Sequence, residues 1–424
     1  MIDTIGPNEA EMIVHGAEWT AKSLFVYPNE FIYWSIQIVM YPYMTGLVAG
    51  AFVLSSLYHV FGQKDLKEIA QFSLVFSLAL LPVAAMPLLL HLQQPTRAME
   101  PLLTPHFTSA IAAFGIVFTT YALIVLSEIW FVYRKYFVEQ VHALKGKAGL
   151  SNAMTRTVYR VLTIGAYDVS DGAIRIDKKA ATILAAIGIP VACFLHGYAG
   201  FIFGSVKANA LWMSPLMPVI FIMSAVVSGI ALCMLTYIVI MEWKAFWRRR
   251  GGGAEEAGEI KGAEVEVISK AARYLIGFLV AAISLEMLDL IFRGYTAMKS
   301  WDILRSVMYG KDFMNIFVLQ YTLGNLVPFV LLILPRRTLL RTVIALCLVL
   351  FGVFMMRWNV VIGGQAFSLS FSGYMHYEIP IIPHSLETFK EGVFGALTVI
   401  ATPFLLFWII NKFVPSLRKD TEGI

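Results

Sequence analysis

The chain has 424 residues, of which 58% are hydrophobic and only 14% are charged, and its mean hydropathy is +0.71. Because a soluble globular domain carries about 25% charged residues, this composition excludes a soluble protein and indicates one that spans a lipid bilayer. The formal net charge of +5 is explained by basic loops and gives no argument for nucleic-acid binding.

Nine stretches are long and apolar enough to cross a membrane, since a transmembrane helix needs about 20 mostly apolar residues. In chain order they are residues 31–61, 68–92, 107–133, 180–205, 215–243, 271–296, 313–335, 339–360 and 391–413. We therefore predict an all-α fold, a polytopic transmembrane helical bundle of about nine spans. Counts of eight or ten stay open, because a short or re-entrant segment within 361–390 would change the total.

The distribution of Lys and Arg among the loops predicts the orientation of the bundle. The basic loops contain Arg134, Lys135, Lys145, Lys147, Arg156, Arg160, Arg175, Lys178, Lys179, Lys244, Arg248, Arg249, Arg250, Lys261, Lys270, Arg336, Arg337, Arg341, Arg418 and Lys419. Three of the alternate loops are poorer in basic residues: 93–106 offers only Arg97, 206–214 only Lys207 and 361–390 only Lys390. With nine spans, all basic loops fall on one side. This places the N-terminus outside and the C-terminus in the cytoplasm of a bacterial or archaeal cell, as a multi-pass protein of the cytoplasmic (inner) membrane.

A glycine-rich run, Gly251-Gly-Gly-Ala-Glu-Glu256, predicts a flexible and solvated linker between two groups of spans. The expected organisation is an extracytoplasmic segment 1–30, five spans in 31–243, a cytoplasmic linker 244–270, four spans in 271–413 and a cytoplasmic tail 414–424. Within the first segment, residues 9–24 are expected to form an interfacial helix.

Ionisable residues inside a membrane are expensive, and the sixth span contains three of them. Glu286, Asp289 and Arg293 follow one another at spacings that place them on one face of a helix. Asp289 and Arg293 can form an ion pair, which leaves Glu286 as a spare carboxyl and makes this face the candidate for proton transfer. The alternative is an ion pair that only fixes helix packing. Two further acids, Glu128 and Glu242, are expected to extend to the cytoplasmic surface.

Further polar residues are predicted to gather in the outer half of the membrane. Pro82 and Pro87 should bend the second span, which ends at His91 and is followed by Arg97. A histidine there can donate to a quinone carbonyl and pass on a proton. The other candidates at this depth are His196 and Tyr198 in the fourth span, Gln37 and Tyr41 in the first, and Asn359 at the end of the eighth.

Several short motifs, in order along the chain, resemble the NrfD/PsrC family, the membrane subunits of polysulfide-reductase-type respiratory complexes. They are Phe194-Leu-His-Gly-Tyr198-Ala-Gly-Phe201, Trp212-Met-Ser-Pro-Leu-Met-Pro218, Phe221-Ile-Met-Ser-Ala-Val-Val-Ser-Gly229, His91-Leu-Gln-Gln-Pro-Thr-Arg97, and Arg357-Trp-Asn359 with Gly363-Gly-Gln365. Gln93-Gln94 departs from the Gly-Arg that is usual in the family, which weakens the likeness at that loop.

The resemblance implies a quinone-reactive subunit that is not an autonomous enzyme. Such a subunit exchanges electrons between menaquinone or ubiquinone and an extracytoplasmic iron–sulfur (ferredoxin-like) partner within a larger respiratory complex, and it binds no haem or metal itself. By position, the resemblance carries the quinone site over to His91, Arg97, His196 and Tyr198. Proton translocation is a further expectation, and the Glu286 face is where we would look for it.

Two other classes of membrane protein stay open. A di-haem cytochrome b-type anchor needs four intramembrane histidines in facing pairs, and His59, His91, His106 and His196 are poorly placed for this. A secondary transporter is favoured by broken helices, and Gly324-Asn325 with Pro328 could break the seventh span. The cysteines Cys193, Cys233 and Cys347 lie in apolar runs, which predicts neither disulfides nor a metal site.

Overall fold

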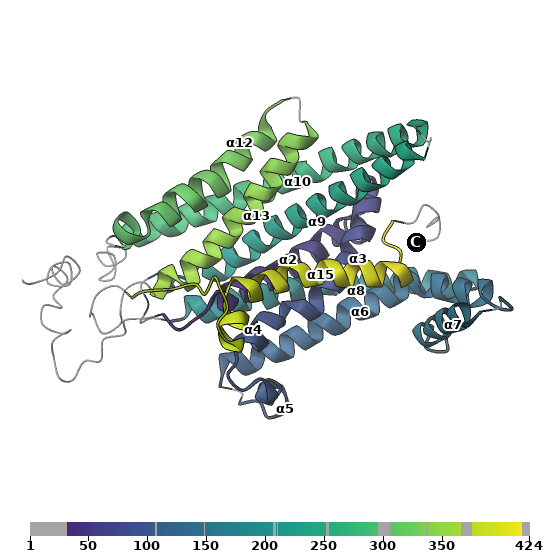
Figure 1. The fold of residues 1–424 in the computed structure, drawn as a ribbon, viewed down its shortest axis with the longest axis horizontal. Helices are drawn as coiled ribbons and strands as arrows, with labels where there is room; N and C mark the ends of the chain where they lie inside the picture. The colour runs from purple at the N-terminus through teal and green to yellow at the C-terminus, as the bar shows by residue number, and fades with distance from the viewer. Residues whose placement is uncertain are drawn as a thin grey trace, which may run out of the picture.

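The computed structural model describes residues 32–417 except 107, 148, 207–208, 210, 252–253, 296–304, 306, 336–337 and 366–374. In this part of the chain nine helices are long and apolar enough to cross a membrane, which confirms the predicted all-α bundle of about nine spans (Figure 1). The interfacial helix expected at 9–24 lies outside the described residues. The orientation of the termini stays a prediction.

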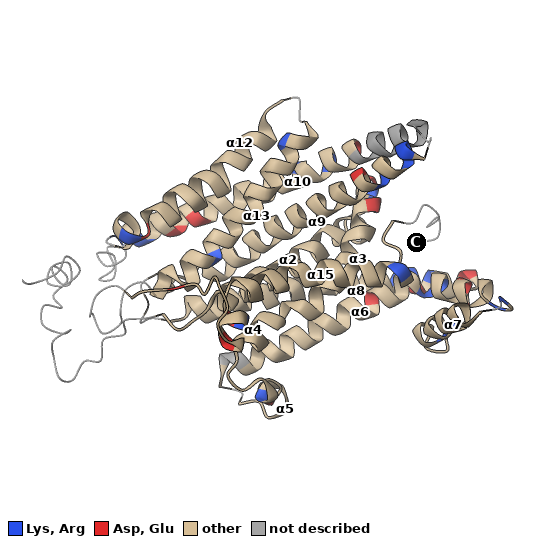
Figure 2. Ribbon diagram, viewed as in Figure 1, with Lys and Arg blue, Asp and Glu red and all other residues tan. Residues whose placement is uncertain are grey.

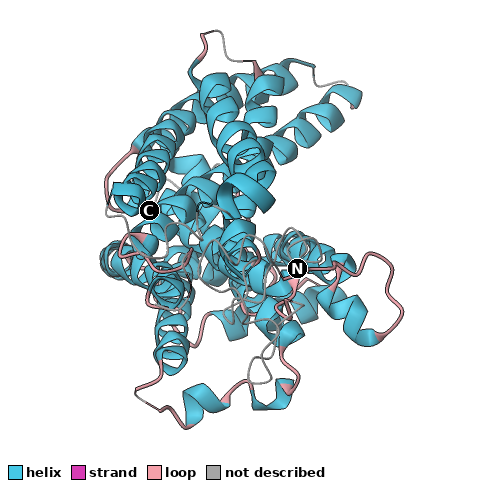
Figure 3. Ribbon diagram, turned by 90° about the vertical axis from the view of Figure 1, so that its left-hand side faces the viewer, coloured by secondary structure: helices cyan, strands magenta, loops and turns pink. Residues whose placement is uncertain are grey.

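The elements follow the predicted spans, with helices that extend beyond several of them. They are α2 (Ile36–His59), η3 (Lys64–Leu66), α3 (Lys67–Ala84), α4 (Met86–His91), η4 (Pro95–Arg97), α5 (Glu100–Leu103), α6 (Ala110–Ala143), α7 (Leu150–Leu162), α8 (Asp171–Gly204), α9 (Met217–Arg250), α10 (Ala254–Tyr295), η5 (Val307–Lys311), η6 (Met314–Leu326), α12 (Val327–Ile333), α13 (Leu339–Val361), η7 (Gly363–Gln365), α14 (Leu386–Glu391) and α15 (Val393–Phe413). Figure 3 shows these helices turned by 90°. Helices suit a bilayer because each satisfies its backbone hydrogen bonds internally.

Two prolines explain the break in the second span. α3 contains Pro82 and ends at Ala84, and α4 begins at Met86 with Pro87 in its first turn. Proline removes a backbone hydrogen bond and its ring clashes with the preceding turn, so the helix cannot continue straight. The predicted bend is confirmed, and it directs α4 and His91 to one end of the bundle.

Helices occupy most of the described part of the segment 244–270, and of the run 251–256 that was predicted to be flexible, residues 254–256 lie in α10. α9 continues to Arg250, and α10 runs without interruption from Ala254 to Tyr295. Between Ala254 and Lys270 the sequence is rich in Ala, Glu and Val and has only two glycines, so helix formers outweigh the breakers.

Lys and Arg gather at one end of the bundle, at the right of Figure 2, where α9 ends and α7 lies. We call this the basic end; it comprises the last turn of α9 with Arg248, Arg249 and Arg250, and the connection between α6 and α8. The positive-inside rule assigns such an end to the cytoplasm. α4 and the last turns of α13, which carry Arg357 and Asn359, belong to the opposite end.

The centre of the bundle is formed by α2 and α9, which pack closely against each other. A Cβ placed on Gly50 of α2 would lie 2.7 Å from the Cα of Gly229 of α9, so the two backbones approach where neither has a side chain. α9 also packs against α10, α8 and α13, and it therefore holds the rest of the bundle together.

A second pair of glycines joins η6 to α13. A Cβ on Gly352 would lie 2.6 Å from the carbonyl carbon of Gly324, inside the distance that real side chains tolerate. η6 is wound as a π-helix until Leu326, and α12 then continues as an α-helix with Pro328 in its first turn. The expected disturbance in the seventh span is therefore a change of helix type. Such π-helical segments are rare and are frequent at functional sites.

We expect the substitution Gly352→Ala to force η6 and α13 apart and to lower the free energy of unfolding by about 2 kcal/mol, a typical cost of overpacking. The measurement is thermal unfolding of the purified protein in detergent. Gly277→Ala on α10 is the matched control, because no atom lies within 4 Å of the added Cβ. Equal midpoints for the two variants would contradict the close contact.

Candidate functional site

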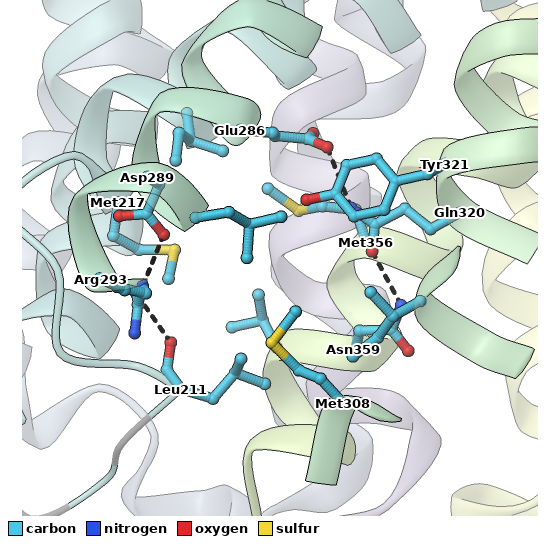
Figure 4. A pocket seen from close by; sticks show the side chains of 14 residues that line it. Leu211, Met217, Glu286, Asp289, Arg293, Met308, Gln320, Tyr321, Met356 and Asn359 are labelled. Carbon is cyan, nitrogen blue, oxygen red and sulfur yellow. Dashed lines mark hydrogen bonds and ion pairs between the residues drawn. The ribbon is translucent and has the colours of Figure 1, made fainter. Parts of the chain in front are cut away.

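A cavity lies between α9, α10, η5, η6 and α13, near the end of the bundle opposite the basic end (Figure 4). Much of its wall is apolar and flexible, with the methionines Met217, Met308 and Met356 and with Ile220. The polar residues that line it are Glu286, Asp289, Arg293, Gln320, Tyr321 and Asn359. An apolar slot with a few convergent polar groups is the usual construction of a small-molecule site.

A chain of acid and amide side chains runs along one wall of the cavity. Glu286 Oε2 accepts hydrogen bonds from the side-chain amides of Gln320 at 3.0 Å and Asn325 at 3.2 Å. Gln320 Oε1 in turn accepts a hydrogen bond from Asn359 Nδ2 at 2.8 Å. Glu286 is only 7% exposed. The chain places one carboxyl, with fixed orientation, at the edge of an apolar slot.

The second acid of the cavity is already paired. Arg293 Nε donates to Asp289 Oδ2 at 2.8 Å, and the hydroxyl of Ser214 donates to Asp289 Oδ1. Arg293 also donates to the backbone oxygen of Leu211 at 3.1 Å. The predicted geometry is therefore present, since Asp289 and Arg293 pair and Glu286 stands apart from the pair with amide partners of its own.

Arg357 of α13 is a residue that the sequence analysis quoted in a motif but did not choose as functional. Its side chain is completely buried, and its Nη2 donates to Ser224 Oγ at 2.7 Å and to His196 Nε2 at 2.9 Å. The guanidinium lies 3.8 Å from the centre of the Phe221 ring, in a cation–π contact. A charged residue inside the last turns of the eighth span was the signal that could have identified it.

His196 lies beside Arg357 and is only 1% exposed. Because arginine can only donate, Nε2 of His196 accepts and the proton is assigned to Nδ1. Nε2 is thus already engaged, which argues against its use as an axial haem ligand in this arrangement. The neighbour of Arg357 in sequence, Met356, lines the cavity, so the Arg357–His196 cluster lies directly behind the wall that also carries Asn359.

His91 and Arg97 are not among the residues that line the cavity with Glu286. His91 Nδ1 lies 3.1 Å from Ser35 Oγ and 3.2 Å from a carboxylate oxygen of Glu391, which ties the end of α4 to α14. Arg97 is exposed and donates to Glu100 at 2.8 Å, which lowers the pKa of the Glu100 carboxyl. Both side chains therefore have structural partners at the surface.

The remaining predicted residues also have separate surroundings. Gln37 is fully buried and donates to the backbone oxygen of Lys390 at 2.6 Å. Tyr41 packs edge-on against Phe114. Tyr198 is half-buried and contacts the rings of Phe194 and Phe201, both of which are exposed on the outside of α8. Of the residues expected at one outer site, the structure brings only Asn359 together with the Glu286 face.

Among the described residues, no group of three or more His, Cys, Asp or Glu side chains is arranged to hold a metal ion. The polar groups of the cavity include an acid that is bound only by amides, Glu286, an acid that is paired with an arginine, Asp289, and amide side chains. Such a set is suited to hydrogen bonding and proton transfer.

Comparison with known proteins shows the group to which this chain is related. A model of the family described as "Polysulphide reductase, NrfD" matches residues 27–369. The chain is 27% identical over 404 residues to a subunit of the selenate reductase of Mesobacillus selenatarsenatis, covering 92% of this chain and 87% of that protein. It is 27% identical over 219 residues to a putative membrane subunit of a dimethyl sulfoxide reductase of Halobacterium salinarum, covering 51% of this chain and 46% of that protein.

Proposed function

Since the chain belongs to the NrfD family of polysulphide reductase membrane subunits, we propose that it is the quinone-binding subunit of a respiratory oxidoreductase complex. It exchanges electrons between the membrane quinone pool and an iron–sulfur partner subunit on the outer side of the membrane. The two related proteins are named as subunits of a selenate reductase and of a putative dimethyl sulfoxide reductase. A terminal reductase complex with further subunits is therefore the assembly that we propose.

The observation that carries this proposal is the chain Asn359–Gln320–Glu286 in the wall of an apolar cavity. A quinone headgroup is a flat, apolar ring with two carbonyl oxygens, and it needs hydrogen-bond donors and a proton-transfer partner. The buried Oδ1 atom of Asn359 has no hydrogen-bond partner in the described part of the chain, so it can accept from a hydroxyl of the reduced quinol, while the Tyr321 hydroxyl can donate to a carbonyl of the quinone. The residues present therefore fit a menaquinone or a ubiquinone.

Each group of the cavity has a distinct task in this proposal. Bound quinone supplies two-electron, two-proton redox chemistry. Gln320 and Asn325 hold the Glu286 carboxyl in one orientation, where it can accept or release a proton at the cavity wall. The methionines and Ile220 exclude water from the slot. Tyr321 also points into the cavity and offers a hydroxyl (Figure 4).

Arg357 is proposed to balance the charge of the site. The Glu286 carboxyl and the Arg357 guanidinium lie close enough to interact electrostatically, although no hydrogen bond joins them. When Glu286 gives up its proton, a negative charge forms in a medium of low polarity, and a nearby cation reduces the cost. Glu286 is therefore suited to be the first group that accepts a proton from the site. We propose that this proton movement accompanies electron transfer.

The site assignment can be tested against the positions that the family resemblance suggested. We expect His91→Leu to keep most of the native rate of quinol-linked electron transfer, because His91 does not line the cavity and its partners are Ser35 and Glu391. The measurement is electron transfer between a soluble quinol or quinone and the assembled complex in membranes. A collapse of the rate in His91→Leu, with the native rate in Glu286→Gln, would move the quinone site from the cavity to the end of α4.

A further inference from the structure

Glu128 of α6 is a buried acid that the proposed quinone site does not use. The sequence suggested that it extends to the cytoplasmic surface, and this was wrong, because its side chain is 0% exposed. Neither of its carboxylate oxygens has a hydrogen-bond partner among the described residues. An ionised carboxylate without partners is very costly inside a protein, so the group is held as the neutral acid unless something binds to it.

Aromatic contacts fix how α6 lies against α2. Tyr41 of α2 packs edge-on against Phe114 of α6 at 5.4 Å, and further along Phe52 packs in the same way against Tyr121 at 5.6 Å. The hydroxyl of Tyr121 also donates to the backbone oxygen of Val48 at 3.4 Å. The two helices therefore run in the same direction, with nearly the same offset in residue number along their length.

Two helical turns beyond the Phe52–Tyr121 contact, three polar residues lie at a similar depth. Glu128 follows Tyr121 by two helical turns on the same face of α6, and His59 follows Phe52 by two turns on α2, with Ser55 between them. Ser55 Oγ and His59 Nε2 are both buried and, like the Glu128 oxygens, have no partner in the described part of the chain. Helix spacing thus places three polar groups that have no partner in the described part of the chain at similar depth, in one layer of the bundle, one on α6 and two on α2.

Within the described part of the chain, no charged side chain of the neighbouring elements forms a hydrogen bond with Glu128. α8 faces α6 with small side chains at this depth, Ala181 and Ala185, both buried. Toward the basic end, Arg134 of α6 and Asp177 of α8 are paired with each other at 2.7 Å. Glu68, on α3, accepts a hydrogen bond from Tyr237 at 3.0 Å on the side of α9.

Arg156 and Arg160, on α7, lie beyond this layer, because α7 packs along the part of α6 that follows Trp130. Glu128 is therefore isolated from the charges of the basic end, while His59, the last residue of α2, marks the boundary of the buried region.

We propose that Glu128, His59 and Ser55 form a proton-binding site in the half of the membrane nearest the basic end. The Glu128 carboxyl takes up one proton through His59, whose ring nitrogen can accept a proton from the water side and pass it on. Ser55 supplies a hydroxyl that can donate to the carboxylate or accept from the neutral acid. The proposal rests on the proton movement proposed above and supplies its site on the cytoplasmic side, since the Glu286 cavity lies at the opposite end.

The first test uses the native complex in membranes and does not depend on quinone. Dicyclohexylcarbodiimide forms stable adducts with protonated carboxyl groups in apolar surroundings, and peptide mass spectrometry locates them. We expect an adduct on Glu128 at neutral pH and none on Glu139, a half-buried acid of the same helix that pairs with Lys135 at 4.0 Å. Absence of an adduct on Glu128, or equal modification of the two acids, would overturn the proposal.

The second test measures protons moved per electron transferred in vesicles that contain the complex. Glu128→Gln keeps the shape of the side chain and removes its proton, so we expect the ratio to lose the protons moved through this site and to fall to the value that quinone chemistry alone supplies. Glu139→Gln should keep the native ratio. An unchanged ratio in Glu128→Gln would overturn the site. A native complex that shows no quinol-linked electron transfer would instead contradict the quinone function, while the adduct on Glu128 still decides the proton site.

Discussion

Replacement of Glu286 by glutamine is expected to reduce quinol-linked electron transfer by about a hundredfold or more, the usual contribution of a proton-transfer group. Glutamine keeps the size of the side chain and can still pair with Gln320 and Asn325 after rotation of the amides. It cannot carry the proton. The measurement is the rate of quinol-linked electron transfer in membranes, together with the amount of assembled complex.

Two variants on the same helix separate this effect from damage to α10. Glu266→Gln is the matched control, because Glu266 is exposed and pairs with Lys270, at 2.8 Å, far along α10 from the cavity. Asp289→Asn should lower the amount of assembled complex, since it breaks the pair with Arg293. If Glu286→Gln turned over at the rate of Glu266→Gln, the carboxyl would have no role in proton transfer.

Replacement of Arg357 by leucine is expected to lower the free energy of unfolding by about 3 kcal/mol, because it leaves the buried Nε2 of His196 without a partner and removes a large packed side chain. Arg357 joins α13 to α8 through His196 and to α9 through Ser224. The helices that carry the cavity wall would therefore lose one of their fixed contacts. Thermal unfolding in detergent measures the loss.

A lysine at the same position makes the prediction more specific. Arg357→Lys keeps the charge near Glu286 but loses the planar guanidinium that lies over the Phe221 ring, so its stability should lie between those of the native chain and the leucine variant. Arg273→Leu on α10 is the control, because that arginine is exposed. A midpoint for Arg357→Leu equal to the control's would show that the buried guanidinium does not hold the helices together.

The fold could be predicted from the sequence because the bilayer leaves few choices. About 20 apolar residues in a row have to form a spanning helix, and all nine predicted stretches are helices in the structure. The spacing of Glu286, Asp289 and Arg293 also sufficed to predict which two side chains pair, since neighbours on a helix face are fixed by helix geometry alone.

The site could be predicted only in part, because its contacts join residues far apart in the chain. Gln320 and Asn359 reach Glu286 from η6 and α13, and nothing in the local pattern reports how those helices pack. The expected gathering at the outer face relied on depth in the membrane. Depth does not determine rotation about the helix axis, so Tyr198 faces outward on α8 while His196 faces the interior.

Glu128 and the residues that follow Gly253 are two further features that the local sequence did not predict correctly. Glu128 lies near basic residues in sequence, which suggested that it reaches the surface, but rotation of α6 turns it into the interior of the bundle. Three glycines suggested a flexible connection, yet the helix formers that follow them continue α10 well beyond the membrane-spanning part. Local composition therefore predicted which stretches span the membrane as helices, but it did not predict where those helices end.

The most direct test of the central claim is photolabelling of the assembled complex with a photoreactive quinone analogue, followed by identification of the labelled peptides. We expect labels on η6, on the end of α13 and on the part of α10 around Glu286, all displaced by excess unmodified quinol. Labels confined to α4 and the segment from His91 to Arg97, or labels that excess quinol does not displace, would contradict the assignment of the quinone site to the Glu286 cavity.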